Sequence, residues 1–284
     1  MDYPNPDIVA ETDWLAAHLH DPHVVVVDCD EQPAYFRLHT EGAVGVRVHH
    51  YLKEKGDSAS GPGIGTHIMP PDQFAETMGR MGISNDSMVV TYDSMGGLYA
   101  ARFWWALNYY GHTNTKVLNG GFRKWFEEGR PVSVDSRHVE RATFEVRAIN
   151  EAICATRQSV EAGVGKADTV VLDVRSSGEY TGDDPRANER GGHIPGATNI
   201  EWLDLTVRPP ERSGLLLPAD ELAGKLESMG VTPDKQVFTH CQAGIRAAYA
   251  YFVLRLMGYD RAANYDGSWA EWGNLADTPI VAGR

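Results

Sequence analysis

The chain has little of three features that would assign it to particular protein classes: cysteine, long apolar runs and positive charge. Its 284 residues hold three cysteines, Cys29, Cys154 and Cys241. So small and odd a number does not build a disulfide framework, which favours a reducing compartment. No apolar run approaches the roughly 20 residues of a membrane span, and residues 1–7 lack the basic segment and apolar core of a secretory signal. The sequence therefore predicts a cytoplasmic protein with no membrane partner.

Positive charge is in deficit, because 26 lysines and arginines stand against 39 aspartates and glutamates, a formal net charge of −13. That balance argues against nucleic acid and anionic membranes as the main partner. Any anion-binding site must therefore be positive locally, through backbone amides and a few arginines. The histidines show no metal-ligand spacing, and no Walker lysine or dinucleotide glycine motif is present. We expect neither a metal nor a cofactor.

The chain contains one internal repeat, because segments of the first half have counterparts in the same order in the second half. The matched segments are 24–28 with 170–173, 39–43 with 193–197, 89–93 with 237–241, and 119–125 with 266–272. In each half, short apolar runs alternate with helical patterns, which is typical of a mainly parallel sheet flanked by helices. The sequence therefore predicts an α/β fold with two tandem domains.

The boundary between these domains is expected in residues 130–150, which hold Pro131 and a charged polar run without an apolar period. We therefore predict a first domain over residues 1–140 and a second over residues 151–284. In the first domain the expected elements are strands at 24–28, 44–48, 88–92 and 116–118, helices at 71–81 and 99–110, and a loop at 55–65.

Residues 237–248 are the stretch around which we expect the functional site. Residues 237–240 are predicted to form a buried strand and residues 247–257 an apolar helix. The loop between them begins with Cys241 and ends with Arg246. A strand, loop and helix of this kind direct successive N–H groups and a helix N-terminus at one point, and that field favours a thiolate. The loop is therefore predicted to bind an anion against a nucleophilic sulfur.

The first half differs at this place, since Asp93 occupies the position of Cys241. An aspartate cannot serve as a sulfur nucleophile, and its carboxylate would repel a bound anion. We therefore expect the second domain to be active and the first to be a structural or interface partner. Cys29 and Cys154 are interpreted as small buried apolar residues.

Two chemistries use a thiolate in an anion-binding loop: hydrolysis of phosphate esters and transfer of a sulfane sulfur. Residues 240–246 are similar to the tyrosine-phosphatase signature, but that signature has one residue more between its cysteine and its arginine. The four residues found here are Gln242, Ala243, Gly244 and Ile245. A shorter loop closes a tighter ring of amides, which suits a single sulfur atom better than a tetrahedral phosphate. Sulfur transfer is favoured, and a cysteine phosphatase, an arsenate reductase and a non-catalytic sulfur carrier are kept as alternatives.

In combination, several motifs resemble the two-domain rhodanese family of sulfurtransferases, over residues 8–280. These motifs are residues 118–122, 192–197, 241–246 and 265–272. The resemblance implies two rhodanese-like domains, of which the first is inactive and has an aspartate, here Asp93, in place of the cysteine. It also places the catalytic cysteine at Cys241.

The same resemblance implies a double displacement, in which the Cys241 thiolate takes a sulfur from thiosulfate and releases sulfite. The resulting persulfide would be held by the loop that follows, namely by the amides of Gln242, Ala243, Gly244, Ile245 and Arg246. Arg246 either positions the donor anion or braces the loop. The expected partners are a small anionic sulfur donor and an acceptor that is cyanide or a thiol.

The choice of donor lies between thiosulfate and 3-mercaptopyruvate. Gln242 and Ala243 match neither the basic residue of many thiosulfate-using relatives nor the small neutral loop of mercaptopyruvate-using ones. Where many relatives have a substrate-binding arginine, this chain has Glu179, which weakens the mercaptopyruvate interpretation. We therefore expect thiosulfate sulfurtransferase activity with Arg186 as a further anion contact, and keep 3-mercaptopyruvate sulfurtransferase as the alternative.

Overall fold

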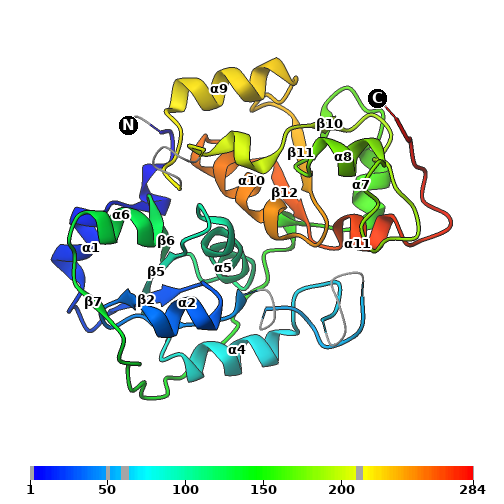
Figure 1. Ribbon diagram of the computed structural model, residues 1–284. Coiled ribbons are helices and arrows are strands. Elements are labelled where there is room, and N and C mark those ends of the chain that lie inside the picture. Colours follow the sequence, from blue (N-terminus) through cyan, green and yellow to red (C-terminus); the bar gives the residue numbers. More distant parts are fainter. Residues whose placement is uncertain (1–2, 49–51, 59–63, 209–213, 284) are drawn as a thin grey trace.

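The computed structural model describes residues 3–48, 52–58, 64–208 and 214–283, which form two α/β domains of the same topology (Figure 1). The first sheet has the order β1-β6-β5-β2-β4, and all its neighbouring strands are parallel. Its strands are β1 (Val9–Ala10), β2 (Val24–Asp28), β4 (Val44–Gly45), β5 (Met88–Tyr92) and β6 (Thr115–Leu118). A separate antiparallel pair joins β3 (His39–Thr40) to β7 (Val132–Ser133).

The second sheet repeats this order as β8-β12-β11-β9-β10, again with parallel pairs throughout. Its strands are β8 (Cys154–Ala155), β9 (Thr169–Asp173), β10 (Thr198–Asn199), β11 (Gln236–His240) and β12 (Ala262–Tyr265). The central strands also share their register, since Tyr92 pairs with Asp28 in one sheet and His240 with Asp173 in the other. The predicted α/β class with two tandem domains is confirmed.

Helices flank both sheets. In the first domain they are α1 (Thr12–His18), α2 (Gln32–Arg37), α4 (Pro71–Arg80), α5 (Leu98–Tyr109) and α6 (Gly121–Glu127). In the second they are α7 (Arg157–Gly163), α8 (Ser177–Thr181), α9 (Ala219–Ser228), α10 (Ile245–Leu256) and α11 (Ser268–Trp272). Short 3-10 turns lie at Pro6–Ile8, Glu151–Ile153 and Trp202–Leu205. None of the helices in the described ranges has the length and hydropathy needed to cross a bilayer.

The predicted elements agree with these bounds to within two residues, except that the strand expected at residues 44–48 is only Val44–Gly45. It is short because it lies at the sheet edge beside β2, and β2 ends at Asp28, the partner of Gly45. The loop after Cys241 is also shorter than predicted, because α10 begins at Ile245 and Arg246 lies in its first turn. Residues 55–58 and 64–65 hold no helix or named strand, as expected for a loop, and residues 59–63 lie outside the described ones. The domain limits at residues 140 and 151 stay a prediction.

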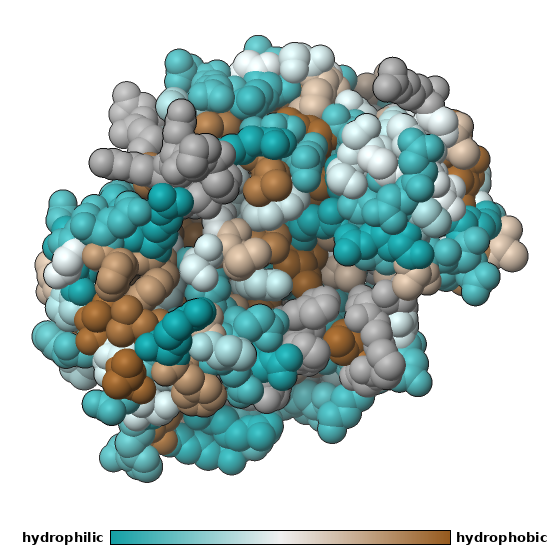
Figure 2. Space-filling view, viewed as in Figure 1, coloured by the Kyte–Doolittle hydropathy of each residue, from teal (hydrophilic) through white to brown (hydrophobic). Residues whose placement is uncertain are grey.

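The two domains meet through α5 and α10, which pack against each other. Both helices are apolar nearly all round and buried, as such helices must be. The Trp104 ring of α5 lies edge-on to Phe252 of α10 at 5.2 Å and is tilted against Tyr251 of α10 at 6.0 Å. Figure 2 shows apolar side chains where the two halves meet and mostly hydrophilic ones on the outer faces. Because each helix directly follows the loop at the end of a central strand, this packing brings both loops to the domain boundary.

Candidate active site

The candidate site lies at the carboxyl end of β11, the middle strand of the second sheet. Cys241 follows β11 directly, and Gly244 is the N-cap of α10 with a φ of 74°. That left-handed backbone favours glycine and lets the chain turn from strand to helix within a few residues. Cys241 is only 1% exposed, so its sulfur lies among buried groups at the domain boundary.

The start of α11 holds the loop in place through hydrogen bonds. The Ser268 hydroxyl oxygen accepts the N–H groups of Cys241 and Gly244, both at 3.1 Å. The same hydroxyl donates to the Tyr265 carbonyl at 2.7 Å, and the N–H of Trp269 donates to the Cys241 carbonyl. Ser268 has a φ of 51°, a strained backbone for a residue other than glycine. The sequence singled out residues 265–272 as a motif but did not reveal this supporting role.

The corresponding loop of the first domain shows what such a turn can hold. The Asp93 carboxylate accepts four backbone N–H groups, from Met95 and Gly97 at 2.8 Å, from Tyr99 at 2.7 Å and from Ala100 at 2.8 Å. Burial and the neighbouring Asp30 raise the pKa of Asp93 to about 6, while the N–H groups act to lower it, so the side chain is ionised at neutral pH. The first domain therefore fills its own anion cradle with a carboxylate.

In the second domain the equivalent cradle is open. Counting from the N-cap glycines Gly97 and Gly244, the counterparts of Tyr99 and Ala100 are Arg246 and Ala247. No hydrogen-bond acceptor lies at the N–H groups of Arg246, Ala247 or Ala243 within the described residues, whereas the Gly244 N–H is taken by Ser268. Cys241 stands where Asp93 stands, so open N–H groups surround a sulfur there. The arrangement can stabilise negative charge on an atom attached to that sulfur.

Arg246 is bound to Glu179 rather than left free. Its guanidinium donates two hydrogen bonds to the Glu179 carboxylate, at 2.7 and 2.8 Å, and Arg186 lies 3.3 Å from the same carboxylate. Burial alone would raise the pKa of Glu179, but the hydrogen bonds and charge of Arg246 outweigh it and lower that pKa to about 2. The bracing role of Arg246 is thus visible, and contact of Arg246 or Arg186 with a substrate stays a prediction.

The Gln242 side chain is also engaged. Its amide exchanges two hydrogen bonds with the amide of Asn188, at 2.9 and 3.0 Å, and Asn274 donates to the same Asn188 oxygen at 3.0 Å. The contribution of Gln242 to binding is therefore expected from its backbone. Ile245, the first residue of α10, is buried at 9% exposure and contributes apolar packing beside the cradle.

His240, which precedes Cys241, is fully buried. Burial lowers its pKa to about 4, although the Asp173 carboxylate 3.4 Å from its Nε2 acts in the opposite direction. It is therefore neutral at physiological pH. Among the described residues, no group of three or more His, Cys, Asp or Glu side chains is arranged to hold a metal ion.

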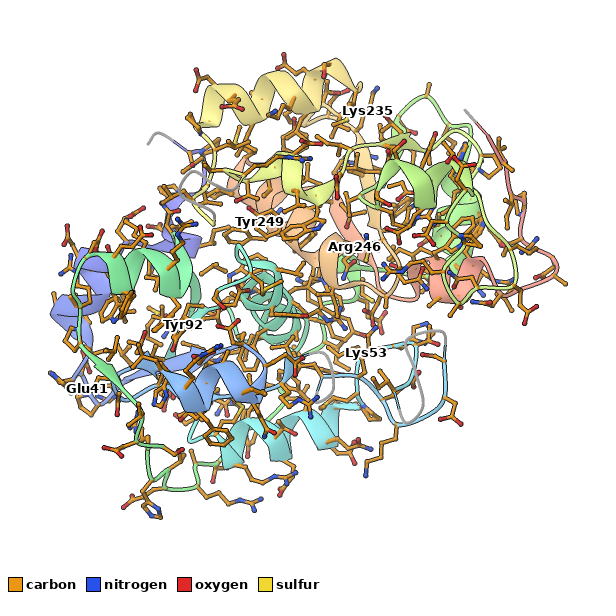
Figure 3. The ribbon with its side chains drawn as sticks, in the orientation of Figure 1. Glu41, Lys53, Tyr92, Lys235, Arg246 and Tyr249 are labelled. Atoms are coloured by element: carbon orange, nitrogen blue, oxygen red, sulfur yellow. The ribbon has the colours of Figure 1, made fainter. Side chains whose placement is uncertain are left out.

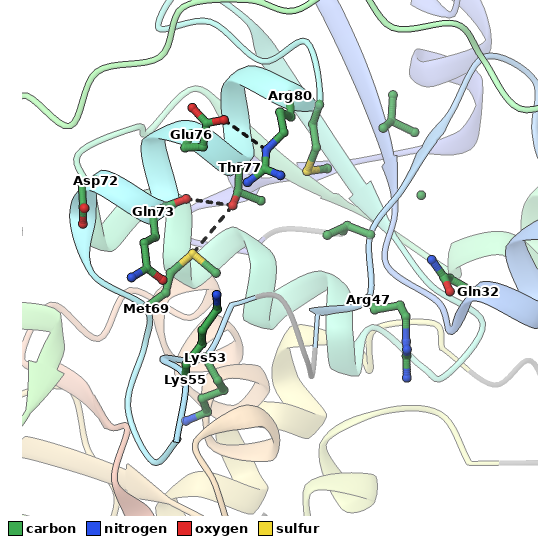
Figure 4. Close-up of a pocket in the computed structure, with 14 residues that line it drawn as sticks. Gln32, Arg47, Lys53, Lys55, Met69, Asp72, Gln73, Glu76, Thr77 and Arg80 are labelled. Carbon is green, nitrogen blue, oxygen red and sulfur yellow. Dashed lines mark hydrogen bonds and ion pairs between the residues drawn. The ribbon is translucent and has the colours of Figure 1, made fainter. Parts of the chain in front are cut away.

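A cavity of about 770 Å³ lies in the first domain beside α4 (Figure 4). Arg47, Lys53, Lys55 and Arg80 contribute positive charge to its lining. Among the described residues that line it, none belongs to the Cys241 loop, although Lys53 of its lining reaches Asp266 of the second domain.

Comparisons with known proteins agree with this arrangement. The family model for the rhodanese-like domain matches residues 11–128 and 156–275. The chain is 36% identical over 296 residues to a sulfur carrier protein, TtuD, of Thermus thermophilus, and the match covers 100% of both chains. It is 33% identical over 279 residues to a thiosulfate sulfurtransferase of Azotobacter vinelandii, covering 98% of each. The crystal structure of SseA from Escherichia coli, a 3-mercaptopyruvate sulfotransferase, superposes with a TM-score of 0.79 at 26% identity over 93% of this chain and 99% of SseA.

Replacing Asp93 tests whether its carboxylate fills the first cradle. Asp93→Ala leaves four N–H groups, two of them buried and two partly buried, without an acceptor, and we expect the free energy of unfolding to fall by roughly 2–4 kcal/mol. Asp93→Asn keeps one acceptor oxygen, so its loss should be about half as large. Urea denaturation of both variants measures these losses. An Asp93→Ala protein as stable as the wild type would contradict the role of this carboxylate.

The Glu179–Arg246 pair predicts a loss of stability in acid. Because the pKa of Glu179 is lowered to about 2 in the folded chain from an ordinary value of 4.5, its stabilisation is present above pH 4.5 and is lost as pH falls toward 2. Glu179→Gln should reduce the free energy of unfolding at pH 7 by roughly 2–4 kcal/mol and flatten this acid slope. Glu41→Gln, at an exposed position, is the matched control. Equal acid slopes for Glu179→Gln and the wild type would count against the pair.

Proposed function

The chain belongs to the rhodanese family of sulfurtransferases, and from that premise we propose that it is a thiosulfate sulfurtransferase with Cys241 as its nucleophile. The observation that carries the proposal is the difference between the two loops. The first domain satisfies its loop N–H groups with the Asp93 carboxylate, whereas the second leaves equivalent N–H groups open around a sulfur. An anionic outer sulfur on Cys241 would receive the hydrogen bonds that Asp93 receives in the first domain.

The proposed reaction has two steps. The Cys241 thiolate first attacks the outer sulfur of thiosulfate, so that a new S–S bond forms while the S–S bond of thiosulfate breaks, and sulfite leaves with the bonding electron pair. The acceptor, cyanide or a thiolate, then attacks the outer sulfur of the persulfide. That second S–S bond breaks, the Cys241 thiolate is restored, and the sulfur leaves as thiocyanate or as a new persulfide.

The engaged arginines favour thiosulfate as the donor. A carboxylate such as that of 3-mercaptopyruvate is held best by a guanidinium fork that has no other partner. Arg246 and Arg186 already have the Glu179 carboxylate as a partner. The sulfonate oxygens of thiosulfate, in contrast, can accept single hydrogen bonds from loop amides. Arg186, whose side chain is 51% exposed, is proposed to add charge at the approach to the site.

Three alternatives are kept behind this proposal. 3-Mercaptopyruvate would use the same persulfide with another leaving group. A sulfur carrier would keep the persulfide on Cys241 and deliver it to a protein rather than turn over with small acceptors. A cysteine phosphatase or arsenate reductase is disfavoured by the four-residue spacing from Cys241 to Arg246. Action in the cytoplasm, without nucleic acid or membrane, is proposed from the composition alone.

A donor assay tests the proposed activity. Purified protein is given thiosulfate or 3-mercaptopyruvate with cyanide, and thiocyanate is measured, with a phosphate ester as a parallel substrate. We expect kcat/KM for thiosulfate to exceed that for 3-mercaptopyruvate by at least about tenfold. The reason is that Arg246 and Arg186 already pair with Glu179 and so do not bind the carboxylate of 3-mercaptopyruvate. A preference for 3-mercaptopyruvate would replace the donor in the proposal, and turnover of the phosphate ester alone would refute sulfur transfer.

Replacing the nucleophile tests the assignment of Cys241. Cys241→Ser should lower the rate by at least about a thousandfold, because a hydroxyl cannot form the persulfide, and should leave the fold intact. Cys29→Ala, which changes a buried cysteine of the first domain, is the control and should retain activity. Substantial activity in folded Cys241→Ser would mean that another residue carries the sulfur.

A further inference from the structure

An ion cluster joins the two domains directly behind the Cys241 loop. Asp266, which follows β12 in the second domain, accepts Lys53 Nζ at 3.2 Å and Arg102 Nη1 at 2.6 Å, and both cations come from the first domain. All three side chains are 1% exposed. The other Asp266 oxygen accepts the N–H of Ile68 at 2.6 Å. We call Lys53, Arg102 and Asp266 the interdomain triad.

The interdomain triad touches the catalytic loop at Gly244. A Cβ atom at Gly244 would lie 2.4 Å from the Asp266 Oδ1, so only glycine fits against the carboxylate. The Gly244 carbonyl is approached by Arg102 Nη1 at 3.5 Å and by Asn264 Nδ2 at 3.2 Å. Figure 3 places Lys53 of the first domain and Arg246 of the second on opposite sides of the domain boundary. The triad therefore contacts the turn that joins Cys241 to α10.

The triad holds more positive than negative charge. Two cations share Asp266, which in the described part of the chain is the one carboxylate at ion-pair distance from either of them. Arg102 Nη2 is buried without a hydrogen-bond partner, although its guanidinium lies 4.4 Å above the Trp105 ring. Burying an excess charge is costly unless an anion lies nearby.

Cys241 is within electrostatic range of the triad. Burial lowers the pKa of Lys53, Asp266 acts to raise it, the neighbouring Arg102 lowers it further, and negative charge on Cys241 also acts to raise it. His67 lies at the rim between the partly exposed Glu54 and Glu271, at 3.4 and 3.7 Å, so a protonated His67 offsets one of these two carboxylates. The remaining negative charge is at the partly exposed rim, where solvent and salt screen it more than they screen the buried triad. The other titratable neighbours are Cys154, Tyr109 and Tyr110. Burial raises the pKa of all three, to about 12 for Cys154 and Tyr109, so each is neutral at pH 7.

We propose that Lys53 and Arg102 are positioning residues that the first domain supplies to the second. Together with Asp266 they leave one excess positive charge next to Gly244. This charge stabilises the anionic sulfur on Cys241, both as thiolate and as persulfide. The inference rests on the proposed function for the persulfide, but its effect on the thiolate is measurable without any turnover. It also gives the inactive first domain a definite part in the chemistry.

The test changes the charge of the triad by substitution and measures the effect on the alkylation of Cys241. The rate of iodoacetamide labelling of the Cys241 peptide is followed by mass spectrometry from about pH 5 to about pH 10, because the thiolate is the reacting form. Lys53→Met makes the triad neutral, Asp266→Asn raises its excess to two charges, and the double variant restores a single excess charge. Lys53→Arg, which keeps the charge, is the matched control.

We expect the half-maximal pH of labelling to rise by on the order of one unit in Lys53→Met, to fall in Asp266→Asn and to return toward the wild-type value in the double variant. Lys53→Arg should label at or below the wild-type pH. Thiosulfate turnover near pH 7 should fall about tenfold in Lys53→Met, following the lost thiolate.

A purely structural role would give a different pattern, because the double variant would then be at least as impaired as either single one. Superimposable profiles for wild type and folded Lys53→Met, or a rise in Lys53→Arg equal to that in Lys53→Met, would overturn the proposal. If Lys53→Met does not fold, the direction of the Asp266→Asn shift decides: a fall supports the proposal and a rise or no change refutes it. Normal alkylation shifts in a protein that turns over no sulfur donor would instead refute the proposed function and leave the electrostatic inference standing.

Discussion

Backbone N–H groups at the start of a helix have no partner within that helix, and both halves of this chain direct such groups at one point beyond a central strand. These N–H groups need hydrogen-bond acceptors from outside the helix, and the two domains differ in which acceptor they provide. In the first domain the Asp93 carboxylate satisfies them permanently. In the second, Ser268 takes two N–H groups of the loop, and no described residue accepts the N–H groups of Ala243, Arg246 and Ala247 beside Cys241. The same turn thus holds a carboxylate in one domain and a cysteine in the other.

The two domains depend on each other through the helices that follow these loops. α5 and α10 are apolar nearly all round, so most of each helix must be buried, and each covers the other. The same contact brings Lys53 and Arg102 against Asp266, close to Gly244. The first domain, which has Asp93 at the position of Cys241, therefore covers α10 and places two cations beside the Cys241 loop.

Much of this arrangement follows from local sequence. The repeat, the apolar strand at β11 and the largely apolar α10 predict the fold and the position of Cys241, because periodicity and loop chemistry act over a few residues. The pairing of Glu179 with Arg246 did not follow, since 67 residues separate the two and nothing in either segment specifies the contact. The sequence predicted that the Asp93 carboxylate would repel a bound anion. It did not predict that this carboxylate itself accepts the hydrogen bonds that such an anion would receive. The interdomain triad was also out of reach, because Lys53 and Asp266 are 213 residues apart.

The central claim is that the open N–H groups at Cys241 stabilise a sulfur anion attached to it. The most direct measurement is peptide mass spectrometry of the protein after incubation with thiosulfate and removal of excess donor, without reductant. The account predicts a mass gain of one sulfur atom on the peptide that holds Cys241, none on those that hold Cys29 or Cys154, and loss of the gain on addition of cyanide. A peptide of Cys241 that stays unmodified, or a gain that cyanide does not remove, would contradict it.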